Sequence, residues 1–95
     1  MSSEENVRAE IYVSGRVQGV GFRRFARNSG KRLGVDCNPV NLMDGRVFVV
    51  AEGKREALEL LINDLRKGPT YAHVEDVNVT FKTASGSVYD FSFRS

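Results

Sequence analysis

The start of the chain alternates between apolar and polar residues, which is the pattern of a β-strand that packs one face on a core. Ala9, Ile11 and Val13 share one face of this strand, which we expect to end at about Gly15. Residues 47–51, in contrast, are apolar at every position, as is typical of a strand buried on both faces. The pattern therefore predicts a sheet with residues 47–51 in a central strand.

A weaker strand pattern covers residues 35–40. Pro39 and two polar residues interrupt it, and proline is tolerated in a sheet mainly at its edge. An Asp-Gly pair at 44–45 follows and predicts a hairpin turn. We therefore expect an edge strand at residues 35–40, joined by a hairpin to the central strand.

Two segments carry apolar residues at the spacing of an amphipathic helix. The first begins at Phe22 and ends near Gly34, where glycine suits the C-cap. The second ends at the Gly-Pro pair of residues 68–69, and four apolar residues at helical spacing mark it: Leu58, Leu61, Ile62 and Leu65. The sequence thus predicts one helix after the first strand and one after the central strand.

The last part of the chain predicts two more strands. Val77, Val79 and Phe81 alternate with polar residues, and a turn is expected at residues 85–86. Three aromatic residues then mark a last short strand: Tyr89, Phe91 and Phe93. The element order β-α-β-β-α-β with a short extra C-terminal strand predicts an α+β, ferredoxin-like sandwich, in which two helices cover one face of an antiparallel sheet.

The ferredoxin-like topology brings two distant segments of the chain together. Its first and second strands point the same way, so the loop after the first and the turn after the second lie at the same end of the sheet. We therefore expect the loop of residues 16–23 to lie near Asn41.

The composition is that of an ordinary globular domain. With 27% charged residues and a formal net charge of +2, the chain does not indicate nucleic-acid or membrane binding. A single cysteine, Cys37, cannot form an internal disulfide, and the first residues lack the basic and apolar regions of a signal peptide. We therefore expect a cytoplasmic monomer, with residues 1–7 as a frayed N-terminus and residues 8–95 as a single domain.

The segment that joins the first strand to the first helix is rich in glycine and ends in arginine. It reads Gly15-Arg-Val-Gln-Gly-Val-Gly-Phe-Arg23, and its glycines allow the backbone to turn N–H groups inward around an anion. The helix start adds unpaired N–H groups, and the planar fork of Arg23 suits two phosphate oxygens. The segment therefore predicts a phosphate-binding loop made of Arg16, Val17, Gln18, Gly19, Val20, Gly21, Phe22 and Arg23.

Spacing alone leaves other interpretations of these residues open. Glycines between a strand and a helix are often only turn residues, and Asn41, which precedes an Asp-Gly turn, could likewise serve only the turn. The loop lacks the spacing of Walker and dinucleotide-binding loops. No serine has a nucleophile-elbow pattern, and the one histidine, His73, is far from Cys37 in sequence, so a side-chain nucleophile is not expected.

Two motifs resemble those of a known family. The run Val13-Ser-Gly-Arg-Val-Gln-Gly-Val-Gly-Phe-Arg-Arg24 is similar to the N-terminal signature of the acylphosphatases, and Asn41-Leu-Met-Asp-Gly-Arg-Val47 resembles their second block. The similarity extends from about Arg8 to the end of the chain. It implies the ferredoxin-like fold, Arg23 as the phosphate ligand and Asn41 as the catalytic residue that positions the attacking water.

The resemblance also implies an activity. An acylphosphatase hydrolyses the carboxyl-phosphate bond of an acyl phosphate by in-line attack of water, which releases a carboxylate and inorganic phosphate. No metal or cofactor is expected, the substrate phosphate is expected to accept the water's proton, and inorganic phosphate is expected to inhibit. The family usually has Gly-Trp-Val where this chain has Cys37-Asn38-Pro39, so the edge strand is expected to pair differently or to be irregular.

Two other functions remain open at this point. One is a non-catalytic anion-binding or regulatory domain that kept the fold and the loop but lost turnover through the change at residues 37–39. The other is an RNA-binding module, because RNA-recognition domains share this topology and the first helix has a basic face of Arg24, Arg27, Lys31 and Arg32. Against RNA binding, residues 45–50 lack the stacking aromatics expected on the central strands.

Overall fold

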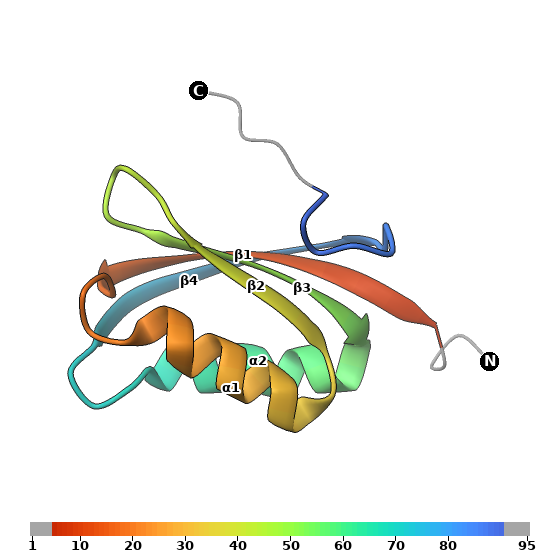
Figure 1. Ribbon diagram of the computed structural model, residues 1–95, viewed down its shortest axis with the longest axis horizontal. Coiled ribbons are helices and arrows are strands. Elements are labelled where there is room, and N and C mark those ends of the chain that lie inside the picture. Colours follow the sequence, from red (N-terminus) through yellow and green to blue (C-terminus); the bar gives the residue numbers. More distant parts are fainter. Residues whose placement is uncertain (1–4, 91–95) are drawn as a thin grey trace.

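The computed structural model describes residues 5–90 of the 95-residue chain. Its elements follow one another as β1 (Asn6–Arg16), α1 (Phe22–Leu33), β2 (Asp36–Asn41), β3 (Val47–Lys54), α2 (Arg55–Lys67) and β4 (His73–Thr83). They form a two-layer sandwich in which both helices cover one face of a four-stranded sheet (Figure 1). The predicted element order and the ferredoxin-like fold class are thereby confirmed.

The sheet is antiparallel and has the strand order β2-β3-β1-β4. β3 pairs with β1 on one side and with β2 on the other, so it lies inside the sheet, as its apolar run predicts. Because β1 and β2 both pair antiparallel with β3, they point the same way. The loop after β1 and the hairpin after β2 therefore lie at the same end of the sheet, which Figure 1 shows on the left.

The core lies between the sheet and the two helices. Its largest fully buried side chains come from both layers and include Ile11, Phe22, Val49, Leu58 and Leu61. A smaller apolar cluster lies on the other face of the sheet, where Val88 packs on Phe48 and Val50. The sheet is thus covered by helices on one face and in part by the segment after β4 on the other.

α1 lies close against β2 because a glycine faces the strand. A Cβ added to Gly30 would lie 2.7 Å from the Cβ of Cys37, so a larger residue would not fit without a shift. The Cys37 thiol donates a hydrogen bond of 3.5 Å to the carbonyl oxygen of Ala26. α1 then ends at Gly34, whose φ of 75° is the left-handed conformation of a C-cap glycine, as predicted.

β2 is a regular edge strand despite its proline. Its six residues pair with β3 from Asp36 opposite Glu52 to Asn41 opposite Val47, without a register shift. The expectation that residues 37–39 would disturb this pairing is therefore wrong. Pro39 is tolerated because an edge strand has hydrogen-bonding partners on one side only, so its missing N–H can face away from the ladder.

The ends of the described chain differ in part from the expectation. β1 begins at Asn6, so residues 6 and 7 pair with β3 although they were expected in the frayed N-terminus. Tyr89 lies in a turn and not in a strand. The other two residues of the predicted last strand, Phe91 and Phe93, lie outside the described residues.

Residues 85–90 are held against the outer face of the sheet by Arg8. Its buried guanidinium donates hydrogen bonds to the carboxylates of Glu10 and Glu52, at 2.9 and 2.8 Å, and to two backbone carbonyl oxygens of the segment. Glu52 in turn accepts hydrogen bonds from two backbone N–H groups of the segment. We call this arrangement of Arg8, Glu10, Glu52 and residues 85–90 the Arg8 clamp.

Candidate active site

The loop between β1 and α1, residues 17–21, is fixed where it leaves the sheet and where it enters the helix. Val17 and Phe22 are both buried in the core. At the end of β1 the pairing with β4 shifts register at Gly15, whose φ is 118°. A Cβ there would lie 2.2 Å from the carbonyl oxygen of His73, so only glycine lets the two strands approach this closely before the loop begins.

A glutamine ties the loop to the hairpin between β2 and β3. Gln18 Nε2 donates hydrogen bonds to the carbonyl oxygens of Leu42 and Arg46, at 2.7 and 2.9 Å. Leu42 directly follows Asn41, the last residue of β2. The two segments that were expected to lie near each other are therefore held together by side-chain hydrogen bonds as well as by the topology.

Two glycines leave the loop backbone open to solvent. Gly19 and Gly21 have φ values of 75° and 80°, and no atom of the described residues lies within 4 Å of the position of a Cβ at either glycine. Gly21 is also the N-cap of α1, where no side chain caps the helix. The N–H groups of the first helical turn therefore stay available, at the positive end of the helix dipole.

A pocket of about 220 Å³ opens between the loop, the start of α1 and the end of β2. Its lining consists of Val17, Gly19, Gly21, Phe22, Arg23, Arg24, Arg27 and Asn41. Arg23 and Asn41, the two residues predicted to be catalytic, thus face one space. Three residues of the predicted phosphate loop do not line it: Arg16 ends β1, Gln18 bonds the hairpin and Val20 packs against the core.

The pocket is cationic. Arg23, Arg24 and Arg27 line it, and none of its lining residues between positions 5 and 90 carries a carboxylate. None of these three guanidinium groups has a hydrogen bond or an ion pair with another residue in the described part of the chain. The mutual repulsion of three like charges favours an anion between them.

Arg24 and Arg27 were not among the site residues predicted from the sequence. Arg27 follows Arg23 by four residues in α1, and residues four apart lie on the same face of a helix. Helical spacing was therefore a signal that could have found Arg27.

Among the described residues that line the pocket, none is suited to act as a nucleophile or a general base, since none carries a carboxylate, an imidazole or a thiol. Cys37 lies on β2, where burial raises the pKa of its thiol to about 12, although the charge of Arg27 acts to lower it. The thiol therefore stays protonated at neutral pH. A thiolate mechanism is not expected for this site.

Two other kinds of site are not found among residues 5–90. No group of three or more His, Cys, Asp or Glu side chains is placed so that it could hold a metal ion. Neither α1 nor α2 is long and apolar enough to cross a membrane.

The outer face of the sheet has two aromatic side chains but no open stacking surface. Tyr12 and Phe48 lie together there with ring centroids 4.8 Å apart, so residues 45–50 do contribute one aromatic ring to this face. Phe48 is only 2% exposed, because Val88 and Leu42 pack against it. A nucleic-acid base could not stack on a ring covered in this way, and the RNA-binding alternative gains no support.

Comparison with known proteins gives consistent matches along most of the chain. The Acylphosphatase family model matches residues 9–93. A curated acylphosphatase of Thermus thermophilus is 51% identical over 78% of this chain and 84% of its own length, and one of Roseiflexus is 44% identical over 90% and 91%. The solved structure of the acylphosphatase from Bacillus subtilis matches with a TM-score of 0.82 at 34% identity, covering 84% of this chain and 90% of that one.

Proposed function

The chain belongs to the acylphosphatase family and is an acyl phosphate hydrolase, and from this premise we propose which of its residues carry out the reaction. Arg23 and the open N–H groups of the loop hold the phosphoryl group, and Asn41 orients the attacking water. The observation that carries this proposal is the one pocket that Arg23, Asn41, Gly19 and Gly21 line together.

Phosphate binding at this site rests on charge and on backbone geometry. The phosphoryl group of an acyl phosphate is anionic, with its charge spread over the nonbridging oxygens. The guanidinium fork of Arg23, which has no partner among residues 5–90, can donate to two of these oxygens, and the uncapped N–H groups at the start of α1 can donate to the same group. The chain's own donors therefore supply the positive charge that the transition state needs.

Asn41 approaches the same space from the end of β2, a different element from the one that carries Arg23. Its amide can both accept a hydrogen bond from a water molecule and donate one to it. A water held in this way is turned with a lone pair toward phosphorus, which supplies the positioning on which phosphoryl transfer mainly depends.

The reaction is an in-line displacement at phosphorus. The bond from the water oxygen to phosphorus forms as the bond from phosphorus to the acyl oxygen breaks, and the electron pair of that bond leaves with the carboxylate. Because no lining residue within positions 5–90 has a basic side chain suited to take it, the proton of the water goes to a phosphate oxygen. A carboxylic acid has a pKa of about 4, so its anion leaves without help from a general acid.

Three further properties belong to the proposal. Inorganic phosphate inhibits competitively, because it is the product that the loop holds. The protein works as a monomer, since every residue assigned to the site comes from one chain. It works in the cytoplasm, where the reducing conditions suit a chain whose single cysteine is free.

The test is a hydrolysis assay with purified protein and benzoyl phosphate in water labelled with ¹⁸O. We expect turnover that a chelator does not change, with the label in phosphate and not in benzoate. Added inorganic phosphate should raise KM and leave kcat unchanged. Label in benzoate would show attack at the carbonyl carbon, and phosphate binding without any turnover would support the non-catalytic alternative.

A further inference from the structure

Asn41 lies where a strand is held least firmly by its own sheet. It is the last residue of β2, which is an edge strand and pairs only with β3. Its side chain is exposed and has no hydrogen bond with another residue among residues 5–90. The ends of strands open more readily than their middles. The position of the Asn41 amide therefore depends on what holds the backbone at this end of β2.

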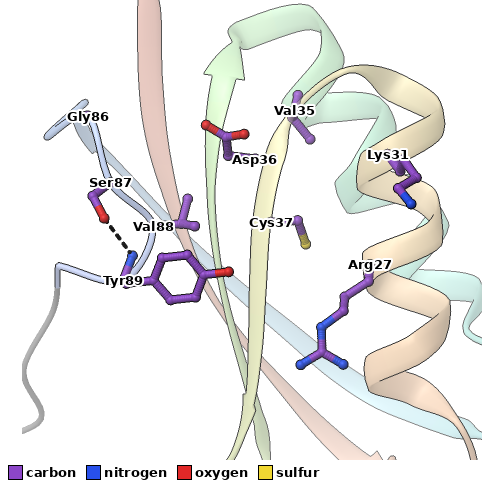
Figure 2. Close-up of a pocket in the computed structure, with 9 residues that line it drawn as sticks. All are labelled: Arg27, Lys31, Val35, Asp36, Cys37, Gly86, Ser87, Val88 and Tyr89. Carbon is purple, nitrogen blue, oxygen red and sulfur yellow. Dashed lines mark hydrogen bonds between the residues drawn. The ribbon is translucent and has the colours of Figure 1, made fainter.

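The direction of the Asn41 side chain follows from the alternation along β2. Figure 2 shows Cys37 pointing from β2 toward α1, and Val88 on the other side of the strand. Residues an even number apart on a strand share a face, so Asn41 points to the same side as Cys37. This is the side of α1 and of the 220 Å³ pocket. The alternation thus sets the direction of the amide but not its distance from the phosphate loop.

Gln18 holds the end of β2 at a fixed distance from the phosphate loop. The two hydrogen bonds of its Nε2 go to Leu42 and Arg46, the residues at which the chain enters and leaves the hairpin, which we call the hairpin neck. An amide nitrogen carries two N–H groups, so both donors of Gln18 are used. The N–H of Leu42 also donates to the carbonyl oxygen of Arg46, at 2.9 Å. Gln18 therefore holds both sides of the hairpin neck at once.

The two neighbours of Gln18 belong to the phosphate site. Val17 is 1% exposed and anchors the loop in the core, and Gly19 lines the pocket in which we place the phosphoryl group. The Gln18 side chain thus connects the backbone proposed to bind phosphate to the hairpin that follows Asn41. An in-line attack needs this spacing to be accurate, because a misplacement of about 1 Å can cost about 10²-fold in rate.

We propose that Gln18 is a positioning residue for the hydrolysis. By holding the hairpin neck, it sets where Asn41 and the water that Asn41 orients lie relative to the phosphoryl group. The inference rests on the roles proposed above for Asn41 and the phosphate loop. Gln18 is not among the described residues that line the pocket, so it acts on the reaction through Asn41. Its loss therefore slows the chemical step and leaves phosphate binding intact.

The test is a double-mutant cycle of Gln18→Met and Asn41→Ala, which measures kcat for benzoyl phosphate and the Kd of inorganic phosphate. Methionine keeps the length of the side chain but has no N–H donor. The carbonyl oxygens of Leu42 and Arg46 keep their backbone donors, so the variant should fold. Gln18→Met should lower kcat about tenfold, as a displaced water implies, and should change the Kd by less than about twofold.

The cycle separates positioning from a general structural role. With Asn41→Ala already present, Gln18→Met should lower kcat by less than about twofold, because there is no longer an amide to position. A defect of the fold or of the phosphate loop would lower kcat by the same factor in both backgrounds.

Asn38→Leu is the matched control. Asn38 also donates from a side-chain amide to a backbone carbonyl oxygen, that of Val88 at 3.2 Å. It lies on the face of β2 opposite to that of Asn41 and does not contact the hairpin neck through this bond. Its kcat should equal that of the wild type.

Amide hydrogen exchange gives a readout that does not depend on activity. Gln18→Met should speed exchange of the Leu42 N–H about tenfold, as the loss of two hydrogen bonds at the hairpin neck implies. The N–H of Phe25, which donates to the carbonyl oxygen of Gly21 in the first turn of α1, should exchange as in the wild type.

Three results would overturn the inference alone: an unchanged kcat in Gln18→Met, the same fractional loss of kcat in both backgrounds, or unchanged exchange of the Leu42 N–H. Loss of phosphate binding in Gln18→Met would also overturn it, because the side chain would then shape the loop itself. A near-normal kcat of Asn41→Ala would overturn the role proposed for Asn41 and the inference with it. A wild type that does not hydrolyse benzoyl phosphate would overturn the proposed function.

Discussion

Arg8 and Arg23 have the same kind of side chain, but their guanidinium groups lie in opposite environments within one small domain. Arg8 is 4% exposed, and its donors are occupied by two carboxylates and by backbone oxygens of residues 85–90. Arg23 is exposed and has no hydrogen bond or ion pair with another residue in the described part of the chain. Both lie in ordered elements, β1 and α1, so a difference in local order does not explain the contrast.

The comparison separates a guanidinium that holds the fold from one that is available to a ligand. A buried charge must be paired, since an unpaired one costs several kcal/mol, and Arg8 meets that demand with Glu10 and Glu52. Arg23 instead shares its pocket with two other arginines and with open backbone N–H groups. Such a site gains its stabilisation only when an anion enters it.

Removal of Arg23 is expected to have the largest effect on activity. Arg23→Ala should lower kcat/KM for benzoyl phosphate by about 10³-fold or more, because the main ligand of the transferred group is lost. It should also abolish phosphate binding in calorimetry, while the melting temperature stays close to that of the wild type. Arg23→Lys should restore little, because an ammonium cannot reproduce the two parallel donors. Near-normal turnover of Arg23→Lys would show that charge alone is enough.

Removal of Arg8 should act on stability instead. Arg8→Ala leaves the buried carboxylate of Glu52 without its counter-ion, which typically costs about 3–5 kcal/mol of the free energy of unfolding. Urea unfolding at pH 7 measures this loss, and kcat should be retained at a temperature where the variant is folded. Addition of Glu52→Gln should recover part of the loss, because a neutral amide is less costly to bury. Strictly additive effects of the two substitutions would show that the pair does not interact.

Truncation of Asn41 should have a smaller and more selective effect than that of Arg23. Asn41→Ala should lower kcat by about 10²-fold while inorganic phosphate binds almost as before, since the lost contact is made to the attacking water. Met43→Ala is the matched control, because Met43 is fully exposed in the same hairpin and does not line the pocket. Equal activity of the two variants would show that Asn41 is only a turn residue.

Acid should weaken the Arg8 clamp and so lower the free energy of unfolding. We expect this effect to be smaller than those of the substitutions at Arg23, Arg8 and Asn41. Burial acts to raise the pKa of Glu52, but hydrogen bonds from the Ser85 backbone, Arg8 and the Gly86 backbone outweigh it and hold the pKa below its ordinary value of 4.5. The stability from a carboxylate of lowered pKa is complete above the pKa of the unfolded state and is lost as pH falls through that of the folded state.

The free energy of unfolding should therefore show no decline due to Glu52 between pH 7 and about pH 5, and should fall below about pH 4.5. Glu52→Gln has no proton to gain at this position, so its decline below pH 4.5 should be shallower. Urea unfolding at a series of pH values measures both slopes. Equal slopes in the wild type and the variant would show that other carboxylates cause the loss of stability in acid. Glu10 is one such carboxylate, since its pKa is also lowered.

Helices and strands could be predicted from the sequence where a segment buries one of its faces, because the spacing of its own apolar residues then reveals that face. Alternation in β1 and helical spacing in α1 each record which face meets the core, and Gly34 ends α1 in the left-handed conformation that glycine adopts readily. At β2 the edge strand itself was predicted correctly, and only the irregularity expected at residues 37–39 was wrong, because residue propensities do not show that the strand keeps its register with β3 at Pro39. The prediction also failed at Tyr89, whose place in the alternation does not make a strand where the Arg8 clamp holds the chain in a turn.

The sequence by itself determined where the proposed phosphate loop lies, because Gly19, Gly21 and Arg23 fall within one strand-to-helix connection and need no distant partner to lie close together. Only the tertiary structure decided that Asn41 lines the same pocket, since the antiparallel register of β2 and β3 and the hydrogen bonds of Gln18 bring the hairpin to the loop. It also decided that Arg8 is paired while Arg23 has no partner among the described residues. Arg8 is paired because Glu52, far along the chain, lies opposite it in the register of β1 and β3, and no local pattern contains that information.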